Sequence, residues 1–218
     1  MRTTKRPPLR IQPRRPRGRP KAEDLEGLEA RLVLVARQAF VLHGYGATSI
    51  NAIARSARVS KNTLYARFPS KAALLQAIVA QQIANVDQEL PAANSDDQPL
   101  AEKLRTYVNV ALRRSLSKDV IEINRLILSE SFQFPELGEA ARARFDVGVE
   151  HVAQLIESSA KHDRLVCRNA VVAAEVFLSA VYGWYNSVMI TNRAISDKER
   201  KSWVDNVVRI FMASRSSW

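Results

Sequence analysis

A short run of basic and polar side chains after Ser60 has the chemistry needed to contact a nucleic acid. Leu64 and Phe68 are four residues apart, a spacing that places both on one inward face of a helix. Their neighbours then face outward, with ammonium, amide and hydroxyl groups that can bond base edges or phosphate oxygens. These neighbours are Lys61, Asn62, Thr63 and Tyr65. The pattern predicts a short helix that enters the DNA major groove.

A second short helix is expected just before this one. Apolar residues recur at helical spacing from Ile50 to Ala57, and either Thr48 or Ser49 can cap the segment. A tight break at Arg58 separates it from the next helix, which Ser60 is placed to cap. Two short helices joined in this way have the layout of a helix-turn-helix.

Longer helices are expected on both sides of this pair. Apolar residues recur at spacings of three and four over residues 23–43, and Gly44 and Gly46 supply a C-terminal cap and a turn. His43 falls at the end of the apolar face, where a packed histidine is favoured over a metal ligand. After Pro69, the segment Ser70–Leu90 predicts another amphipathic helix.

The first 21 residues predict a disordered basic arm. They contain nine lysines and arginines, five prolines and no acid, so they have little material for a core or a regular helix. Arg17-Gly18-Arg19-Pro20 is similar to the core of the AT-hook motif, in which a glycine lets the backbone approach a narrow minor groove. Unspecific phosphate contact and plain disorder remain open alternatives. The arm residues expected at DNA are Arg14, Arg15, Arg17, Gly18 and Arg19.

The positive charge of the chain is concentrated near its beginning. The net charge is +11, yet residues 1–80 hold 16 lysines and arginines against four acids, a balance of +12. Residues 81–218 hold 17 against 18, a balance of −1. This asymmetry predicts that the first third meets a polyanion while the remainder has another role.

Cysteine usage and hydropathy predict a cytoplasmic protein. The single cysteine, Cys167, excludes an internal disulfide and a thiolate-based structural zinc site. Prolines follow the first basic residues where an export signal needs an apolar run. The apolar segment 170–190 has one charge and several polar residues, so a buried helix is favoured over a membrane span.

The rest of the chain is also expected to be helical. Residues 91–97 form a linker, and periodic segments follow at 98–118, 119–131, 135–160, 169–192 and 196–214. No alternating strand pattern is evident. The sequence predicts an all-α protein of about nine helices: an arm at 1–21, a three-helix DNA-binding domain at 22–69, a connecting helix at 70–90 and a helical bundle at 98–218.

Residues 47–75 resemble the DNA-binding domain of the TetR family of bacterial transcriptional regulators. The family pattern is present here as Thr48-Ser49, Ile53-Ala54, Val59-Ser60, Thr63-Leu64-Tyr65, Phe68, Ser70-Lys71 and Leu74-Leu75. The segment 123–137 more weakly resembles the C-terminal domain of an AefR-like branch of that family. The resemblance implies that residues beyond 97 form a ligand-sensing and dimerisation domain.

The resemblance also implies a role for each residue on DNA. Thr48, Tyr65 and Lys71 would hold phosphates, while Lys61, Asn62 and Thr63 would point into the groove. The alternative is that Tyr65 partly packs and Lys71 is a solvated lysine at the turn.

Two positions depart from the family pattern. Arg58 replaces the usual glycine of the turn, so it is expected to need a positive φ and could add a phosphate contact. Asn62 replaces another common glycine, and its amide could bond an adenine edge. The preferred operator therefore cannot be carried over from the family.

The last two predicted helices are apolar on more faces than a monomer needs, which predicts a homodimer with a two-fold four-helix interface. Its expected residues are Phe177, Val181, Trp203, Val207, Ile210 and Phe211. Aromatic and apolar residues of the same region predict a pocket for a small apolar or aromatic effector, although such a stripe could equally be plain core. The candidates are Tyr107, Phe132, Phe134, Phe145, Val149, Trp184, Tyr185 and Met189.

No arrangement of residues supports an enzyme or a cofactor site. His43, His151 and His162 lack metal-ligand spacing, no Gly-x-Ser-x-Gly motif occurs, and seven glycines leave little material for a phosphate-binding loop. A packed thiol is favoured over a redox sensor for Cys167.

The sequence as a whole predicts a ligand-responsive repressor that binds a pseudo-palindromic double-stranded DNA operator as a dimer. A ligand-independent architectural protein that binds A·T-rich DNA through the arm is the alternative. A helical enzyme or carrier with an incidental basic tail is the third hypothesis.

Overall fold

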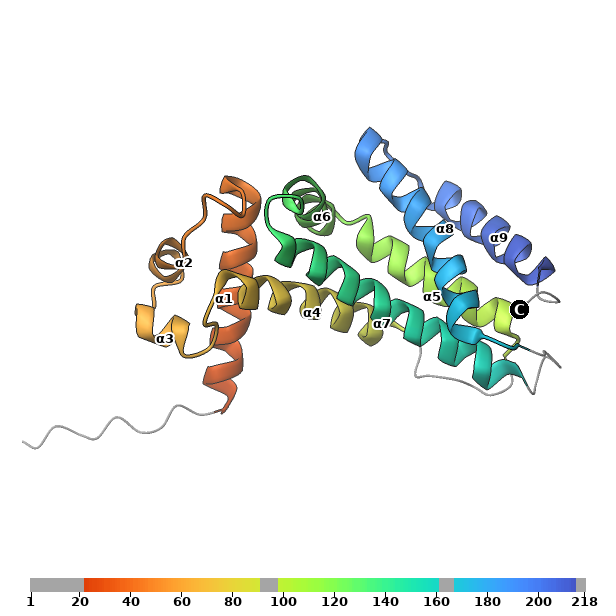
Figure 1. Cartoon of the computed structure of the whole chain (residues 1–218), viewed down its shortest axis with the longest axis horizontal. Coiled ribbons are helices and arrows are strands. Elements are labelled where there is room, and N and C mark those ends of the chain that lie inside the picture. Colours follow the sequence, from red (N-terminus) through yellow and green to blue (C-terminus); the bar gives the residue numbers. More distant parts are fainter. Residues whose placement is uncertain (1–21, 91–97, 161–166, 215–218) are drawn as a thin grey trace, which may run out of the picture.

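The computed structural model describes residues 22–90, 98–160 and 167–214. Within these ranges the chain forms nine α-helices and no strand, which confirms the all-α prediction (Figure 1). The helices are α1 (Ala22–His43), α2 (Ile50–Ser56), α3 (Lys61–Tyr65), α4 (Lys71–Glu89), α5 (Leu100–Ser115), α6 (Lys118–Glu130), α7 (Pro135–Ala160), α8 (Ala170–Thr191) and α9 (Asp197–Ala213). None of the described helices, α8 included, has the length and apolar character needed to cross a membrane.

Serine caps set the beginnings of the helices around the turn. Ser49, Ser60 and Ser70 each accept a hydrogen bond from the backbone N–H three residues later, and so cap α2, α3 and α4. The cap at Ser60 is as predicted, α4 begins after Ser70 as expected, and Ser49 is the cap of α2 rather than Thr48. Gly44 follows the end of α1 with a φ of 81°, in the left-handed region predicted for it.

A small apolar core holds α1, α2 and α3 together at one end of the molecule (Figure 1). Phe40 of α1, Ile53 of α2 and Leu64 of α3 are fully buried, and Phe68 closes the core after α3. Leu64 and Phe68 therefore face inward as predicted. His43, in contrast, is exposed at the end of α1, because the chain turns away there toward Tyr45.

Arg58 occupies the left-handed position of the turn between α2 and α3. Its φ is 54°, its N–H donates to the Arg55 carbonyl at 3.0 Å, and the Val59 N–H donates to the Ala54 carbonyl at 3.0 Å. These two bonds form a Schellman motif, which needs a residue with positive φ at this position. The prediction that Arg58 holds a positive φ is confirmed.

Replacing Arg58 with glycine is expected to stabilise the protein. Glycine adopts the left-handed conformation without a Cβ clash, which relieves about 1–2 kcal/mol of strain in the folded protein. Its greater conformational entropy stabilises the unfolded state by about 0.5–1 kcal/mol. The free energy of unfolding should therefore rise by about 0.5–1 kcal/mol. Thermal unfolding should show a rise of about 2 °C in Tm. The matched control, Arg55→Gly, lies within α2 and should lower Tm instead. An unchanged or lower Tm for Arg58→Gly would contradict the strain argument.

A larger core joins α5, α7, α8 and α9 at the other end of the molecule. Leu104 of α5, Val152 and Ile156 of α7, Phe177 of α8 and Val204 of α9 are all buried in it. Figure 1 shows α4 leaving the N-terminal helices and running toward this bundle beside α7. The connecting helix is thus in contact with both parts.

The N-terminal core continues into α6 and the beginning of α7. Ile123, Leu126 and Ile127 of α6 and Leu137 and Ala140 of α7 are buried with the residues of α1 to α4. The N-terminal helices therefore pack on α6 as well as on α4, and a displacement of either helix can reach them.

Candidate nucleic-acid interface and ligand cavity

The outer face of α3 is the candidate DNA-reading surface. Lys61, Asn62 and Tyr65 are exposed on it, while Leu64 anchors the opposite face in the core. Thr63 is half-buried, and its hydroxyl lies 2.8 Å from the Ser60 hydroxyl, which also accepts the Thr63 N–H. The exposed side chains of Lys61, Asn62 and Tyr65 can therefore reach DNA, whereas the Thr63 hydroxyl is hydrogen-bonded to the capping residue Ser60.

Thr48 lies inside the protein and not on the predicted DNA surface. Its side chain is buried, and its hydroxyl donates to the carbonyls of Gly44 at 2.7 Å and Ala39 at 3.1 Å. The Ala39 carbonyl lies in the last part of α1 and the Gly44 carbonyl just after it, so the hydroxyl joins the loop to the end of α1. The Thr48 side chain is thus used inside the protein, and its phosphate contact stays a prediction without support from this geometry.

Lys71 also has a different environment from the one predicted. Its ammonium donates to the carbonyls of Tyr45 at 2.8 Å and Gly46 at 3.2 Å, and lies 4.6 Å from the centre of the Tyr45 ring. Lys71 is therefore not a fully solvated lysine, and its phosphate contact remains a prediction, because the two carbonyls use only two of its three ammonium N–H groups. It fastens the beginning of α4 to the loop between α1 and α2.

The same loop is held from the other side by α6. The Glu130 carboxylate accepts the N–H groups of Tyr45 and Gly46, each at 3.1 Å. The buried Tyr45 hydroxyl donates to Glu136 at 2.9 Å, and burial raises the pKa of this hydroxyl, with a further rise from Glu136. We call Tyr45, Gly46, Lys71, Glu130 and Glu136 the α6 junction.

Two glycines make the α6 junction possible. A Cβ at Gly44 would lie 2.9 Å from a Glu130 oxygen, and a Cβ at Gly46 would lie 2.8 Å from the Phe134 ring. Phe134 packs edge-on against Tyr45 with ring centres 5.2 Å apart. Phe134 therefore packs beside the α6 junction, and its contact with a ligand remains a prediction.

An ion pair between Arg37 and Asp119 joins α1 to α6 as well. Burial opposes ionisation of Asp119, but hydrogen bonds from Ser117 and Arg37 outweigh it and hold the pKa of the Asp119 carboxyl below its usual value. The Arg37–Asp119 ion pair and the contacts of Glu130 were not predicted from the sequence. In each of them the two partners are more than 80 residues apart, and no local pattern marks them.

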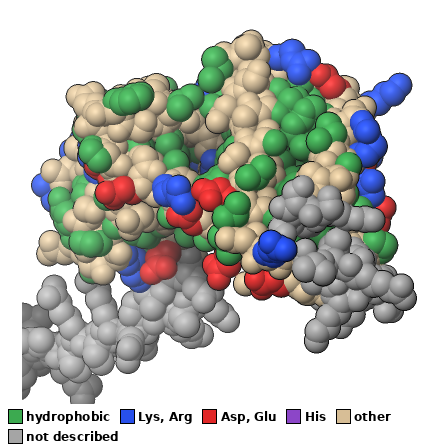
Figure 2. All heavy atoms as spheres, turned by 45° about the vertical axis from the view of Figure 1, so that its right-hand side comes forward, with side chains coloured by type: hydrophobic (Ala, Val, Ile, Leu, Met, Phe, Trp, Pro, Cys, Tyr) green, Lys and Arg blue, Asp and Glu red, His purple; other side chains and the backbone are tan. Residues whose placement is uncertain are grey.

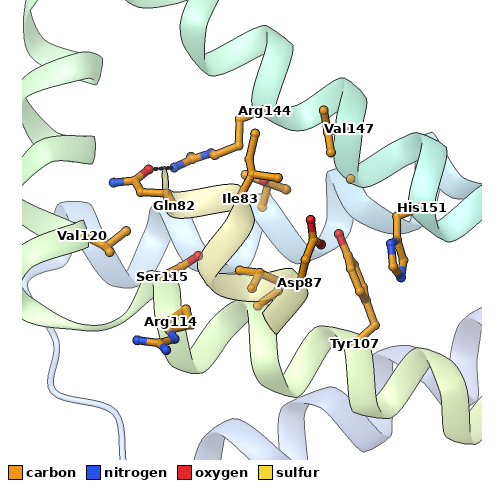
Figure 3. Close-up of a pocket in the computed structure, with 14 residues that line it drawn as sticks. Gln82, Ile83, Asp87, Tyr107, Arg114, Ser115, Val120, Arg144, Val147 and His151 are labelled. Atoms are coloured by element: carbon orange, nitrogen blue, oxygen red, sulfur yellow. Dashed lines mark hydrogen bonds between the residues drawn. The ribbon is translucent and has the colours of Figure 1, made fainter. Parts of the chain in front are cut away.

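A cavity lies between the connecting helix α4 and the bundle (Figure 3). It encloses about 590 Å³, a volume that includes the solvent at its mouth. Its walls come from five helices, α4 to α8. The lining residues are Gln82, Ile83, Val86, Asp87, Tyr107, Ala111, Arg114, Ser115, Val120, Arg144, Val147, Gly148, His151 and Tyr182.

Only some of the predicted pocket residues lie at this cavity. Tyr107 lines it, and Tyr107 and Tyr185 line a smaller adjoining space. Phe132 is 98% exposed at the end of α6, so it cannot form a pocket wall. The others pack within the bundle: Val149 and Met189 in its core, Phe145 against Tyr182, and Trp184 against Trp203.

The cavity is more polar than the sequence suggested. Gln82, Asp87, Arg114, Arg144 and His151 had not been predicted, and they bring amide, carboxylate, guanidinium and imidazole groups to its wall. They lie on α4, α5 and α7, where polar residues at helical spacing are also typical of a solvent-exposed face. Aromatic and apolar residues therefore form only part of the cavity wall.

Two aromatic side chains at one end of the cavity are neutral hydrogen-bonding groups. Tyr107 and His151 stack with ring centres 4.7 Å apart. Burial lowers the pKa of His151 despite an opposing effect of Asp87, and burial raises the pKa of Tyr107. Gly148 leaves room for this arrangement, because a Cβ there would lie 3.2 Å from the Tyr107 hydroxyl.

The predicted dimer residues divide between core and surface. Phe177, Val181 and Phe211 are buried in the bundle of one subunit, and their assignment to a dimer interface remains a prediction. Trp203 and Val207 are half-buried, and Ile210 is 63% exposed. Further exposed apolar residues on α8 are Val171, Val172, Val176 and Ile190.

Hydrophobic side chains gather on the C-terminal part of the molecular surface, with lysines and arginines along its edge (Figure 2). Val172, Val176 and Ile190 lie on one face of α8, since they are separated by about one and about four turns. This face, together with Val207 and Ile210 of α9, is an apolar surface outside the core.

Some predictions fall on residues that the structure does not describe. These are the arm residues Arg14, Arg15, Arg17, Gly18 and Arg19, and His162. Within the described ranges, no group of three or more His, Cys, Asp or Glu side chains is arranged to hold a metal ion.

Comparison with known proteins matches both parts of the chain to one family. Residues 32–78 match the model of bacterial regulatory proteins of the tetR family, and residues 102–214 match that of the AefR-like transcriptional repressor C-terminal domain. The chain is 28% identical over 183 residues to the HTH-type transcriptional regulator Mb1581 of Mycobacterium bovis, covering 83% of this chain and 85% of that one. It is 25% identical over 178 residues to YvkB of Bacillus subtilis, covering 78% and 88%.

Solved structures have the same fold. The flavonoid-responsive regulator FrrA is 26% identical, with a TM-score of 0.72 and coverage of 87% of this chain and 97% of that one. A TetR-family regulator of Syntrophomonas wolfei also has a TM-score of 0.72, at 14% identity, with coverage of 88% and 96%. The AefR-like model alone matches more than half of the chain. This chain therefore belongs to the TetR family of DNA-binding transcriptional regulators.

Proposed function

We propose that this TetR-family regulator is a ligand-responsive repressor, which binds a pseudo-palindromic operator as a homodimer and releases it when a small molecule occupies the cavity beside α4. The observation that carries the proposal is that α4 lines this cavity and is also fastened to the DNA-binding loop through Lys71. One helix thus contacts both the proposed effector and the helix-turn-helix.

The proposed reading of DNA follows from the exposed face of α3. Lys61 and Asn62 contact base edges, Tyr65 contacts phosphate, and Arg58 at the turn can add a second phosphate contact. Thr48 is buried and hydrogen-bonded within the protein, so we assign its side chain a positioning role. Lys71 positions the loop through two of its three ammonium N–H groups and can donate the third to a phosphate.

The homodimer uses the exposed face of α8 and α9. Val172, Val176 and Ile190 of α8 with Val207 and Ile210 of α9 form an apolar surface suited to a two-fold four-helix contact. The buried residues Phe177, Val181 and Phe211 support this surface from within. A two-fold dimer presents two copies of α3, which explains the expected half-sites.

Release of DNA requires a ligand that binds one state more tightly than the other. Gln82, Ile83, Val86 and Asp87 of α4 line the cavity, so a bound molecule displaces or fixes this helix. The displacement reaches α3 through Lys71 at the beginning of α4 and changes the separation of the two recognition helices. The related regulator FrrA responds to flavonoids, which are aromatic, and this likeness supports an aromatic effector here.

Deleting residues 1–21 separates the proposal from an architectural role. The deleted segment carries nine positive charges, so its loss should weaken DNA binding and make its salt dependence shallower. Selective binding should nevertheless survive, since α3 reads the sequence. The measurement is the equilibrium binding constant at several salt concentrations, for an operator fragment and for unrelated DNA of equal length. If selectivity is lost with the arm, the protein is an A·T-rich DNA binder organised by that arm.

A further inference from the structure

Arg144 brings a positive charge into the cavity wall between α7 and α4 (Figure 3). Its Nη1 group donates to the side-chain oxygens of Gln82 at 3.0 Å and Asn124 at 2.8 Å. The guanidinium carbon lies 5.9 Å from the centre of the Tyr182 ring. These partners are two neutral amides and an aromatic ring, so none of them balances the charge.

Neighbouring arginines are neutralised by carboxylates. Arg114, which also lines the cavity, pairs with Glu89, and Arg142 on the same helix pairs with Asp146 at 2.7 Å. Across the described ranges, no carboxylate lies within the 4.0 Å ion-pair distance of Arg144. Arg144 is half-buried, so its guanidinium is partly removed from water without a counter-charge, an arrangement suited to binding an anion.

Arg144 and Gln82 each keep an unused donor. Arg144 can only donate, so the Gln82 oxygen must face it, which leaves the Gln82 amide nitrogen on the other side. That nitrogen and the Nε of Arg144 are both buried and have no hydrogen-bond partner within the protein. Unused donors beside an unbalanced guanidinium favour a carboxylate, whose two oxygens match the planar arginine side chain.

The other cavity residues determine which groups of a ligand, apart from its anionic group, can be bound. Ile83, Val86, Val147 and the Tyr182 ring provide apolar walls. Asp87 and the Tyr107 hydroxyl lie near each other, with Ile83 between them and Gln82 (Figure 3). Asp87 has no ion-pair partner among the described residues, and it repels an anion while accepting a hydrogen bond from a hydroxyl.

We infer that the effector is a small aromatic carboxylate with a hydroxyl at its other end, its carboxylate paired with Arg144 and its hydroxyl directed to Asp87. This inference rests on the proposed function, because it names the ligand class of the proposed effector site. The ring lies against Tyr182 and the aliphatic walls. Neutral aromatic molecules of the same size leave Arg144 without a counter-charge and bind more weakly.

The test compares 4-hydroxycinnamate with its methyl ester by calorimetry on the full chain. The two probes share the ring, the hydroxyl and the unsaturated arm, and differ in the negative charge. The carboxylate should bind at least about tenfold more tightly than the ester, as expected for a hydrogen-bonded charge pair. Arg144→Gln should remove that advantage and leave the affinity for the ester unchanged.

Matched variants separate recognition from folding. Arg142→Gln removes a charge from an exposed position of the same helix and should leave both affinities unchanged. Arg144→Lys keeps the charge and should retain part of the preference for the carboxylate. If Arg144→Gln weakens both probes equally, Arg144 only supports the helices and the inference is wrong. Equal binding of the two probes, or binding of neither, by the unsubstituted protein also overturns it.

Operator binding is measured on the same samples. A protein that selects an operator but shows no carboxylate preference refutes the ligand class and leaves the proposed regulator intact. A protein that selects no operator refutes the proposed function, and calorimetry still decides whether Arg144 recognises a carboxylate.

Discussion

Asn62→Ala is expected to weaken operator binding by about tenfold to a hundredfold, the discrimination that one good side-chain contact to a base edge supplies. Asn62 is exposed near the beginning of α3, where the residues of a recognition helix contact base edges. Its truncation leaves the core and the Ser60 cap in place, so the free energy of unfolding should change little. The measurement is the equilibrium binding constant for the operator, with thermal unfolding as a check on folding.

If Asn62 contacts a specific base, a second result is expected for the Asn62→Ala variant. When the contacted base pair is changed, the unsubstituted protein should lose affinity, whereas Asn62→Ala should bind both DNA sequences almost equally. Gln88→Ala is the matched control, because it removes a similar exposed amide from the far end of α4. If Asn62→Ala and Gln88→Ala bind the operator alike, Asn62 does not read a base.

Glu130→Ala should lower the free energy of unfolding by about 2 kcal/mol, because two charge-assisted hydrogen bonds to the backbone of Tyr45 and Gly46 are lost. For a chain of this length the corresponding loss in Tm is about 4–8 °C. Thermal unfolding measures both quantities. Glu122→Ala is the control, since this exposed α6 carboxylate lies 4.0 Å from Lys118 and should contribute little.

The same substitution tests whether the α6 junction transmits the effector signal. Without Glu130, the loop before α2 keeps the contacts of Lys71, Tyr45 and Thr48 and the packing of Phe134 on Tyr45. A given effector concentration should then release less DNA, even though the affinity for the effector is kept. If Glu130→Ala lowers Tm but releases DNA as the unsubstituted protein does, the junction only stabilises the fold.

Local features of the helix-turn-helix were predictable because each depends on a few adjacent residues. The cap at Ser60 follows from a serine placed before an apolar period. The positive φ of Arg58 was expected because Arg58 stands where the turn of TetR-family proteins usually has a glycine. Leu64 and Phe68 face inward because their spacing permits only one common face.

Contacts between distant segments could not be predicted in this way. Glu130 and Phe134 meet the loop at Gly46 because α6 packs against α1, and nothing near either residue in the sequence records that packing. Lys71 and Thr48 were expected to contact DNA because the family resemblance implied that role. Their partners are backbone carbonyls, which no side-chain pattern reveals.

The sequence also did not show which residues of α8 lie in the core and which lie on the surface. This helix is apolar on most of its faces, so periodicity did not show whether Phe177 or Val176 points inward. The structure buries Phe177 against Phe211 and leaves Val176 62% exposed. The polar lining of the cavity was equally difficult to predict. In the sequence, Gln82 and Arg144 have the pattern of surface residues, and only the packing of α4 against α7 places them at the cavity.

The central claim is that α3 reads a specific operator, and footprinting on genomic fragments selected by the full chain tests it most directly. We expect protection of two inverted half-sites, and loss of that protection in a variant combining Lys61→Ala, Asn62→Ala and Tyr65→Ala. The variant should keep only weak, salt-sensitive binding to any DNA. If the variant protects the same half-sites as the unsubstituted protein, or if the unsubstituted protein protects none, the claim is wrong.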